Sequence, residues 1–224
     1  MNRRVAVIIP TLNEETRIAA AVSSALIVGA SEVIVSDGGS ADRTAEVASA
    51  AGASVMTAGP MRSRQLNAAA SRSSSEILIF LHGDSKLPPG AARLAADSLA
   101  DGHVFGGFQI SFEETSARLR LAETMINLRT RLTRCPWGDQ AQFIERETFL
   151  SSGGFREIAM MEDYDLAIRM KRAGRTAVLP QKVVTSGRRF LDKGVLATAA
   201  TNWRIILAYR LGADPAELER MYRR

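Results

Sequence analysis

The sequence has very few of the residues that cross-link small proteins or bind metals in clusters. It contains one cysteine, Cys135, and two histidines among 224 residues. A lone cysteine excludes an internal disulfide and a multi-cysteine metal site, and it is compatible with a reducing compartment. The chain must therefore depend on a hydrophobic core, and its hydrophobic content of 46% is ordinary for a globular protein of this length.

Long apolar runs and aromatic residues are also scarce. No run is long enough to span a bilayer, and Met1-Asn-Arg-Arg leads straight into an apolar segment, unlike a signal peptide. Aromatic residues make up 6% of the chain, with no stacking motif or recognition-helix pattern, so we expect no nucleic-acid partner. We expect a cytoplasmic protein, with the inner face of the membrane as an alternative location.

Basic residues are concentrated near the end of the chain. The net charge is +5, but the segment 171–224 holds 12 basic and 4 acidic residues, a balance of +8. The preceding part holds 17 basic and 20 acidic residues, a balance of −3. This asymmetry predicts an anionic partner, such as a phosphorylated substrate or anionic lipid headgroups.

Short apolar segments alternate with helical stretches in the first half of the chain. Strands are expected over residues 5–9, 32–35, 53–57 and 77–81, with a helix of small residues near 68–71 after a polar, basic stretch. This order predicts an α/β fold with a mostly parallel central sheet and helices on both faces. The second half predicts strands over 104–112, 141–144, 176–179 and 183–184, and helices over 116–134, 160–174, 194–211 and 215–222. We see no repeat or linker and expect a single domain.

Carboxylates stand at the ends of two predicted strands. Asp37 follows the second strand, and His82-Gly83-Asp84 follows the fourth. Ligands of open α/β sheets bind outside the carboxyl ends of the strands, so Asp84 is a candidate for a metal or diphosphate site. The alternative is that Asp84 caps the following turn. Thr11 or Asn13 is expected to cap the first helix, Asp42 the second, and Gly29 to end the first.

Five segments together resemble the family 2 glycosyltransferases, which have the GT-A fold. They are residues 8–14 (IIPTLNE), 33–44 (VIVSDGGSADRT), 81–84 (LHGD, where the family has Asp-x-Asp), 138–140 (GDQ) with 153–155 (GGF), and 162–166 (EDYDL). The chain most resembles a subgroup of small bacterial enzymes that also carry Arg-x-Arg-Gln-x-Asn and Ser-x-Arg-Arg. It departs from the family at His82 and at Gly38, where aspartates are usual.

The resemblance implies an inverting hexosyltransferase that moves a sugar from a nucleoside diphosphate, expected to be UDP, to an unidentified hydroxyl acceptor. It implies a nucleotide-binding half over 1–102 and an acceptor half over 103–224. Asp163 would be the general base, with Glu162 as its neighbour. Asp84 and His82 would bind a divalent metal, Mn²⁺ or Mg²⁺; a neutral imidazole suits Mn²⁺ better.

The resemblance also assigns the remaining site residues. Arg188 and Arg189 would bind the diphosphate, and Arg62 could contact base or phosphate. The nucleotide site would comprise Pro10, Leu12, Asn13, Glu14, Asp37, Arg64, Asn67, His82 and Gly83, and the acceptor site Trp137, Gly138, Asp139 and Gln140.

Simpler structural roles compete with several of these assignments. Asn13 could be a helix cap, His82 a core histidine, and Trp137 a buried side chain, and Asp139 and Gln140 could shape their loop. The arginines could lie on solvated turns, and Asp165 with Arg169 is expected to form a surface pair.

The helix predicted over 194–211 has an apolar stripe that includes Val195, Trp203 and Leu207, which we expect to pack on the domain. Alternatively, Arg204, Arg210, Arg223 and Arg224 could contact an anionic membrane, which would suit a lipid-linked acceptor.

Two rival functions stay open. One is a nucleotidyltransferase, although the glycine-rich loop with a lysine that such enzymes carry after the first strand is missing. The other is a non-catalytic sugar-nucleotide-binding or interaction protein. His82 and Gly38 favour the second rival, and the Glu162-Asp163 pair argues against it.

Overall fold

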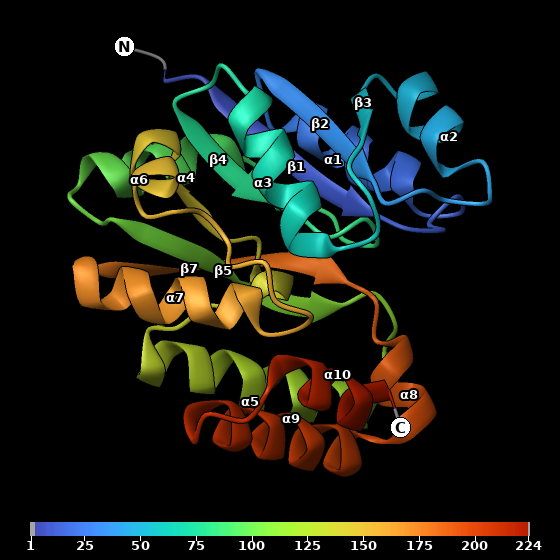
Figure 1. Ribbon diagram of the computed structural model, residues 1–224, viewed down its shortest axis with the longest axis vertical. Helices are drawn as coiled ribbons and strands as arrows, with labels where there is room; N and C mark the ends of the chain where they lie inside the picture. The colour runs from blue at the N-terminus through green and yellow to red at the C-terminus, as the bar shows by residue number, and fades with distance from the viewer. Residues whose placement is uncertain (1–2, 224) are drawn as a thin grey trace.

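The computed structural model describes residues 3–223, without the side chains of Arg189, Asp192, Lys193, Leu196 and Arg223. Its centre is a seven-stranded sheet in the order β3-β2-β1-β4-β6-β5-β7. The strands are β1 (Val5–Thr11), β2 (Glu32–Asp37), β3 (Ser54–Thr57), β4 (Ile77–Phe80), β5 (Phe105–Phe112), β6 (Phe143–Glu145) and β7 (Thr176–Thr185). Figure 1 shows the sheet running through the molecule between layers of helices.

Most strand pairs in the sheet are parallel. β1 pairs in parallel with β2 and β4, and β5 with β7, whereas β6 is antiparallel to both of its neighbours. Successive residues of β1 enter opposite cores: Val5, Val7 and Ile9 face one, Ala6 and Ile8 the other. A strand buried on both faces reads as a continuous apolar run, which is why this part of the fold was predictable.

Helices cover both faces of the sheet (Figure 1). One core contains residues of α1 (Ile18–Ile27), α2 (Thr44–Ala50) and α4 (Ala91–Ala100). The other contains residues of α3 (Arg62–Arg72), α6 (Arg146–Ser151), α7 (Glu162–Ala173), α9 (Val195–Arg210) and α10 (Pro215–Arg223). The expected α/β fold, with a mostly parallel sheet, helices on both faces and C-terminal helices, is therefore confirmed.

Helix α5 (Ala117–Thr133) lies along β5 and satisfies backbone groups of that strand. Asn127 accepts a hydrogen bond from the Ile110 N–H and donates one to the Ile110 carbonyl, both 2.9 Å long. Glu123 accepts from the Phe112 N–H at 2.6 Å. These polar anchors fix the side of α5 that faces the sheet, and α9 packs beside the same helix.

Several local expectations were wrong. Residues 176–185 form one strand with an irregular register against β5 near Phe108 and Gln109, not two strands. The helix after Gly59 begins at Arg62, before the expected residues 68–71, and a short helix that was not expected, α8 (Arg188–Lys193), begins at Arg188. α1 has Arg17 at its N-cap and no side-chain cap, so neither Thr11 nor Asn13 caps it.

Two other helix ends lie close to the sequence signals. The N-cap of α2 is Arg43 and not Asp42, although the carboxylate of Asp42, one residue earlier in the chain, accepts the Thr44 N–H. Gly29, with φ of 83°, follows the end of α1 as expected. Among the described residues, no helix has the length and apolarity to cross a membrane.

Candidate active site

Two clusters of charged side chains lie at the carboxyl ends of β1, β2 and β4. The parallel register places Thr11 of β1 opposite Asp37 of β2, and β4 leads directly into the segment His82-Gly83-Asp84. Asp84 belongs to the first cluster and His82 to the second. This segment therefore joins the two parts of the candidate site at the edge of the sheet where ligands of α/β proteins bind.

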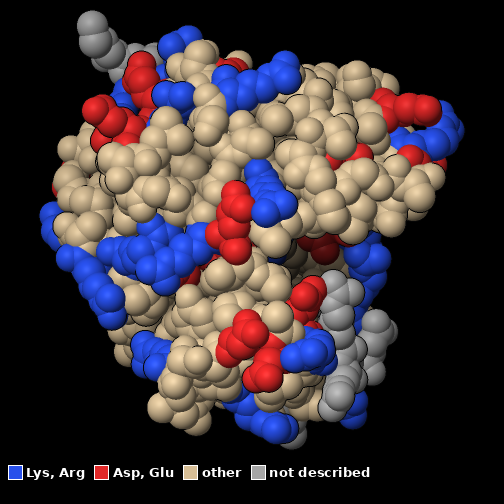
Figure 2. Space-filling model, viewed as in Figure 1, with Lys and Arg blue, Asp and Glu red and all other residues tan. Residues whose placement is uncertain are grey.

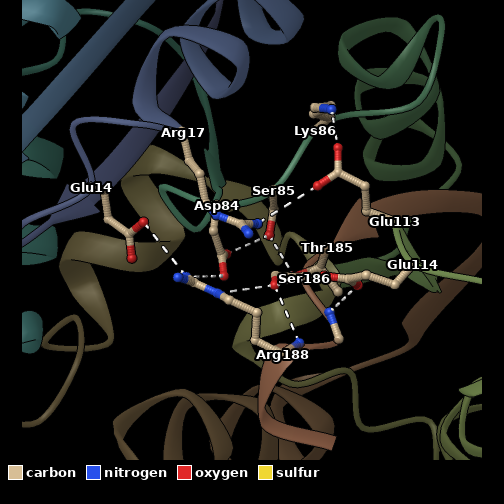
Figure 3. A network of polar contacts seen from close by, with 11 residues as sticks. Glu14, Arg17, Asp84, Ser85, Lys86, Glu113, Glu114, Thr185, Ser186 and Arg188 are labelled. Carbon is tan, nitrogen blue, oxygen red and sulfur yellow. Dashed lines mark hydrogen bonds and ion pairs between the residues drawn. The ribbon is translucent and has the colours of Figure 1, made fainter. Parts of the chain in front are cut away.

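In the first cluster, Arg188 lies between two carboxylates. Its Nη2 is 3.9 Å from an oxygen of Glu14 and 3.9 Å from an oxygen of Asp84 (Figure 3). Burial, followed by the charge of Asp84, raises the pKa of Glu14 above its ordinary value. Arg188 thus supplies a positive charge where two carboxylates converge, and its side chain is more than half exposed.

Hydrogen bonds hold both partners of this contact in place. The Ser85 hydroxyl donates to Asp84 at 3.1 Å and is 2.9 Å from the Thr185 hydroxyl. Just before α8, the Glu114 carboxylate accepts the Gly187 N–H at 2.7 Å. Figure 3 shows these contacts around Arg188. Ser85 therefore links Asp84, which follows β4, to the end of β7, and Glu114 holds the residue that precedes α8.

The loop after β2 is shaped by Asp37. Its buried carboxylate accepts hydrogen bonds from the backbone N–H groups of Gly39 and Ser40, at 3.1 and 2.9 Å. Asn13, in the left-handed region with φ of 56°, accepts the Ala41 N–H at 2.9 Å. The loops after β1 and β2 therefore support each other through side chains assigned to the nucleotide site.

Close packing around position 38 explains why a glycine stands there. A Cβ there would collide with the side-chain amide of Gln65 and lie 3.2 Å from the carbonyl of Thr11. An aspartate, as the family often has, would need this region to be rearranged. Gly83 is also crowded, because its Cβ would lie 3.1 Å from the Thr11 methyl and 3.5 Å from Glu14.

The second cluster is centred on Asp163 at the start of α7. One carboxylate oxygen accepts the Gly138 N–H at 2.6 Å, and the other accepts the Tyr164 N–H at 2.8 Å. The neighbouring Glu162 is 6% exposed and lies 2.9 Å from the Arg62 guanidinium. Burial raises the pKa of Glu162, and Arg62 opposes that rise. The two adjacent acids thus have different environments: one is paired, and the other is oriented by backbone donors.

Gly138 is the contact point of the second cluster. A Cβ at this position would collide with the Arg62 guanidinium, and it would lie 2.8 Å from the Asp163 carboxylate and 3.1 Å from Nε2 of His82. No larger residue fits while these three side chains keep their positions. The predicted acceptor-site glycine is therefore the point where they converge.

His82 is neutral in this environment. Burial and the neighbouring Arg62 lower its pKa to about 4, and its Nε2 has no hydrogen-bond partner among the described residues. The ring borders a cavity of about 10 Å³ that is also lined by Pro10, Gln142 and Phe155. His82 therefore presents an uncharged nitrogen beside Asp163 and Gly138.

The loop that carries Gly138 is fixed by Gln140 and Arg129. The fully buried Gln140 amide accepts the Trp137 N–H at 3.0 Å and donates to the Phe108 carbonyl at 3.0 Å. The Arg129 guanidinium lies 3.4 Å above the Trp137 ring, so one face of that ring is covered. Burial raises the pKa of Asp139, which the charge of Arg129 offsets only in part.

Three polar residues in the first turns of α3 make different contacts. Arg62 enters the Asp163 cluster, whereas Arg64 pairs with Glu157 on the surface at 2.8 Å. The Asn67 amide donates to the carbonyl of Phe155 and accepts from its N–H, at 2.8 and 2.9 Å. Arg64 and Asn67 thus bind other protein groups in the structure. Their predicted contacts with nucleotide stay predictions.

Leu12 is exposed, and Pro10 lines the small cavity beside His82. The side chain of Arg189 lies outside the described residues.

Sequence reasoning missed Arg129 and Gln142. Gln142 donates to the backbone carbonyls of Pro136 and Asp163, at 2.9 and 3.0 Å. No local motif marks either residue, because their partners lie on separate elements.

Asp165 and Arg169 form the expected i, i+4 ion pair, but the expectation that it lies on the surface was wrong. Asp165 is 6% exposed and accepts from Arg169 at 2.7 Å, from Arg156 at 3.0 Å and from the Tyr209 hydroxyl at 3.2 Å. Arg169 also donates to the carbonyl oxygens of Ser152 and Gly154. The pair is a buried joint between α7, the turn at 152–154 and α9.

The donor set for a metal is small. In the part of the chain that the structure describes, no three His, Cys, Asp or Glu side chains are grouped to hold an ion. Asp84, with Glu14 nearby, offers oxygen ligands at the strand end. Such a set fits an ion that shares its coordination with substrate phosphates, as Mg²⁺ often does, and not a site built by protein ligands alone.

Comparison with solved structures shows the same fold in characterised proteins. Glucosyl-3-phosphoglycerate synthase from Mycobacterium tuberculosis, solved with Mn²⁺, UDP-glucose and phosphoglyceric acid, has a TM-score of 0.65 and 21% identity, over 94% of this chain and 80% of that one. TarS from S. aureus has a TM-score of 0.62 and 16% identity, over 97% of this chain and 42% of that one.

A further structure, described as a mycobacterial protein, has a TM-score of 0.60 and 24% identity over 82% of this chain. The match spans 65% of that protein's length. At these identities, the likeness establishes the fold alone.

Sequence comparison gives the family. No curated protein matches this chain. Residues 6–157, which include both strand-end loops, α3 and the Gly138 loop, match the description "Glycosyl transferase family 2". The match covers more than half of the chain, which therefore belongs to glycosyl transferase family 2.

Proposed function

We propose that the protein is an inverting glycosyltransferase that moves a sugar, such as a hexose, from a UDP-sugar to a hydroxyl acceptor, with Asp163 as the general base. Family membership supports the reaction type. The observation that carries the proposal is the difference between the two adjacent acids of α7. Glu162 is buried and paired with Arg62, whereas the Asp163 side chain is 21% exposed and oriented by two backbone donors.

Orientation matters because a base must lie within hydrogen-bond reach of the proton it removes. The Gly138 and Tyr164 N–H groups each occupy one lone pair of Asp163. A carboxylate has about four such positions, so others remain for an acceptor hydroxyl. Arg62 lies 3.9 Å from the Asp163 carboxylate, so the guanidinium that pairs with Glu162 also borders the proposed base.

The reaction exchanges one bond for another at the anomeric carbon. The acceptor oxygen attacks from the face opposite the diphosphate, the carbon–oxygen bond to the diphosphate breaks, and the hydroxyl proton passes to Asp163. The electron pair leaves with UDP, whose negative charge must be stabilised. Arg188 lies beside the strand-end carboxylates, and its exposed guanidinium can turn to the departing phosphate.

A divalent metal, Mn²⁺ or Mg²⁺, would be held by Asp84 together with the diphosphate and would supply further positive charge to the leaving group. His82 beside it would act as a neutral ligand or hydrogen-bonding group. In this proposal, Asp37 and Asn13 hold the two loops that receive the nucleoside, and residues 1–102 and 103–224 serve donor and acceptor.

UDP is proposed as the nucleotide because glucosyl-3-phosphoglycerate synthase, which shares the fold, was solved with UDP-glucose. The acceptor stays open. We propose that the acceptor is bordered by the loop of Trp137, Gly138, Asp139 and Gln140. Gly138 of this loop donates its N–H to Asp163, the proposed general base. A lipid-linked acceptor fits the basic C-terminal segment.

Calorimetric titration tests the donor site. UDP and GDP are each added with Mn²⁺, with Mg²⁺ or with excess chelator. We expect UDP to bind more tightly than GDP and metal to strengthen binding. Binding that is indifferent to metal would assign charge neutralisation to Arg188 and Arg189, and no nucleotide binding under any condition would overturn the proposed function.

A further inference from the structure

Helix α5 exposes a row of large apolar side chains to solvent. Leu121, Met125, Leu128 and Leu132 are 54%, 43%, 52% and 76% exposed. Their spacing of four, three and four residues places them on one face of the helix. The opposite face, with Leu119, is buried against β5. Within the described structure this stripe has no core to pack against, although its side chains are as apolar as those of the core.

The neighbouring helix α9 has a second apolar stripe. Trp203 and Leu207 are 58% and 60% exposed, and Leu211, just after the helix, is 80% exposed. Val195, Ile205 and Ile206 on the other side are buried. The expectation that this stripe packs on the domain was therefore correct only for its buried side. Figure 1 shows α5 and α9 together at the end of the molecule that lies opposite β3 and α2.

Arginines border both stripes, and acidic side chains are scarce on these two helices. The exposed basic residues are Arg118, Arg120, Arg131 and Arg134 on or directly after α5, and Arg204 and Arg210 on α9. The sequence of α9 contains no acidic residue, and the acid of α5, Glu123, is turned toward the Phe112 N–H. Figure 2 shows basic side chains at this end of the molecule, together with a group of acidic side chains.

We propose that this α5–α9 surface docks on an anionic lipid bilayer. Helices that lie in the membrane interface combine an apolar face with flanking Lys or Arg, and anionic lipids attract the basic groups. A second copy of the chain fits less well, because pairing two such faces would bring like-charged arginines together in an interface. An acidic bilayer satisfies both the apolar stripes and their charged borders.

The docked surface is directly connected to the proposed acceptor loop. α5 ends at Thr133, four residues before Trp137, and Arg129 of α5 lies on the Trp137 ring. The contact would hold the acceptor side of the enzyme near the lipid surface. It gives the proposed function a class of acceptor, one presented at a membrane, but docking itself does not depend on glycosyl transfer.

Vesicle binding tests this inference with the intact chain. The protein is sedimented with vesicles of phosphatidylcholine alone or with 30 mol% phosphatidylglycerol, a composition chosen as roughly that of a moderately anionic membrane. We expect at least about tenfold tighter binding to the anionic vesicles and loss of that preference at high salt. Replacing Arg118, Arg120 and Arg131 with glutamine should weaken binding by about fivefold for each arginine. Trp203 emission should shift to shorter wavelength on binding, and Trp203→Phe should remove the shift.

A second variant set separates the apolar stripe from general surface effects. Leu121→Ser, Met125→Ser, Leu128→Ser and Leu132→Ser combined should lower binding at least about tenfold. The matched control is Leu26→Ser with Ile27→Ser, two exposed apolar residues on α1, which should leave binding unchanged. Equal losses in both sets would overturn the proposal.

Light scattering after gel filtration decides between lipid and a second copy. A dimer that dissociates in the four-serine variant, with no vesicle binding by the parent protein, would assign the surface to self-association. UDP titration of the same variants should be unchanged, so a failure of docking can be told apart from a failure of the donor site.

Discussion

Arg62 lies 2.9 Å from Glu162, and this contact separates the roles of two neighbouring carboxylates. Glu162 has almost no access to solvent and has its charge compensated by the guanidinium. Asp163 is 3.9 Å from the same guanidinium and is held by backbone N–H groups instead. Because Arg62 pairs more closely with Glu162, Asp163 is available to act as the proposed base.

Asp163→Asn should lower turnover by about 10² to 10⁴, the usual contribution of a general base. The asparagine amide cannot take up the proton of the acceptor hydroxyl, but its oxygen can still accept one hydrogen bond from a backbone N–H. UDP affinity should stay within about twofold, because the contacts of Asp163 are with the Gly138 loop and α7. Release of UDP from UDP-sugar and calorimetry measure the two effects. Equal loss of turnover and of UDP binding would contradict the assigned role.

Glu162→Gln is the matched comparison for that variant. It removes the negative charge beside a partly exposed guanidinium but keeps an oxygen that can accept its hydrogen bond, so we expect a loss of stability of about 1 to 3 kcal/mol. Turnover of the folded fraction should fall less than in Asp163→Asn. Thermal unfolding and the same UDP-release assay compare the two variants, and a larger catalytic loss at Glu162 would reverse the assignment.

Gly138→Ala should impair catalysis through position alone. The added Cβ would lie 2.8 Å from the Asp163 carboxylate and would press on Arg62, so the base must shift. Displacement of a catalytic group by about 1 Å can lower turnover about 100-fold. We expect the melting temperature to change by only a few degrees, since the loop is also held by Gln140. An unchanged turnover number would show that Asp163 does not depend on this contact.

The sheet and the edge that carries the candidate site were predictable because they follow from local patterns. Strands buried on both faces read as apolar runs, and the residues that end them, Asp37 and Asp84, must meet at one edge of a parallel sheet. Gly138 and Asp163 came from the family resemblance. Their 2.6 Å contact joins residues 25 positions apart in the chain and depends on how the loop packs on α7.

The sequence could not reveal which arginines face the site. Arg62 and Arg64 are two positions apart on α3, so they point in different directions, but only the packing of α3 shows which one turns inward. Asp165 and Arg169 have the spacing of an ordinary surface pair, yet α9 covers them. In each case the decisive partner lies on an element that is distant in sequence.

Asn67→Ala tests a site residue that the structure gives a different partner. Its amide makes two hydrogen bonds to the backbone of Phe155, so its loss should cost about 2 to 3 kcal/mol of folding stability. UDP affinity should stay nearly constant if the side chain acts only through this turn. Urea unfolding and calorimetry measure the two quantities. A large drop in UDP affinity at unchanged stability would instead support the predicted contact with nucleotide.

Cys135 should be an unreactive thiol in the native protein. It is 4% exposed, and burial raises its pKa to about 11 from 9.0. Because the pKa is higher in the folded state, its contribution to stability is full below pH 9 and is lost as the pH rises through 11. The loss is about 3 kcal/mol. A thiol reagent at pH 8 should react slowly before unfolding and quickly afterwards, and Cys135→Ala should flatten the decline of stability between pH 9 and 11. Rapid native modification would contradict the buried position.

Arg188→Gln should weaken UDP binding and make it more dependent on metal. The guanidinium lies 3.9 Å from both Glu14 and Asp84, so its removal takes away one of the positive charges that offset these two carboxylates where they would face the diphosphate. We expect about a tenfold loss of UDP affinity in chelator and a smaller loss in Mn²⁺, because the ion takes over part of the neutralisation. Arg93→Gln, an exposed arginine on α4 that pairs with Asp97, is the matched control and should bind UDP normally. If Arg188→Gln instead binds UDP as well as the parent in chelator, the strand-end contact is structural, and the positive charge for the leaving group must come from elsewhere in the site.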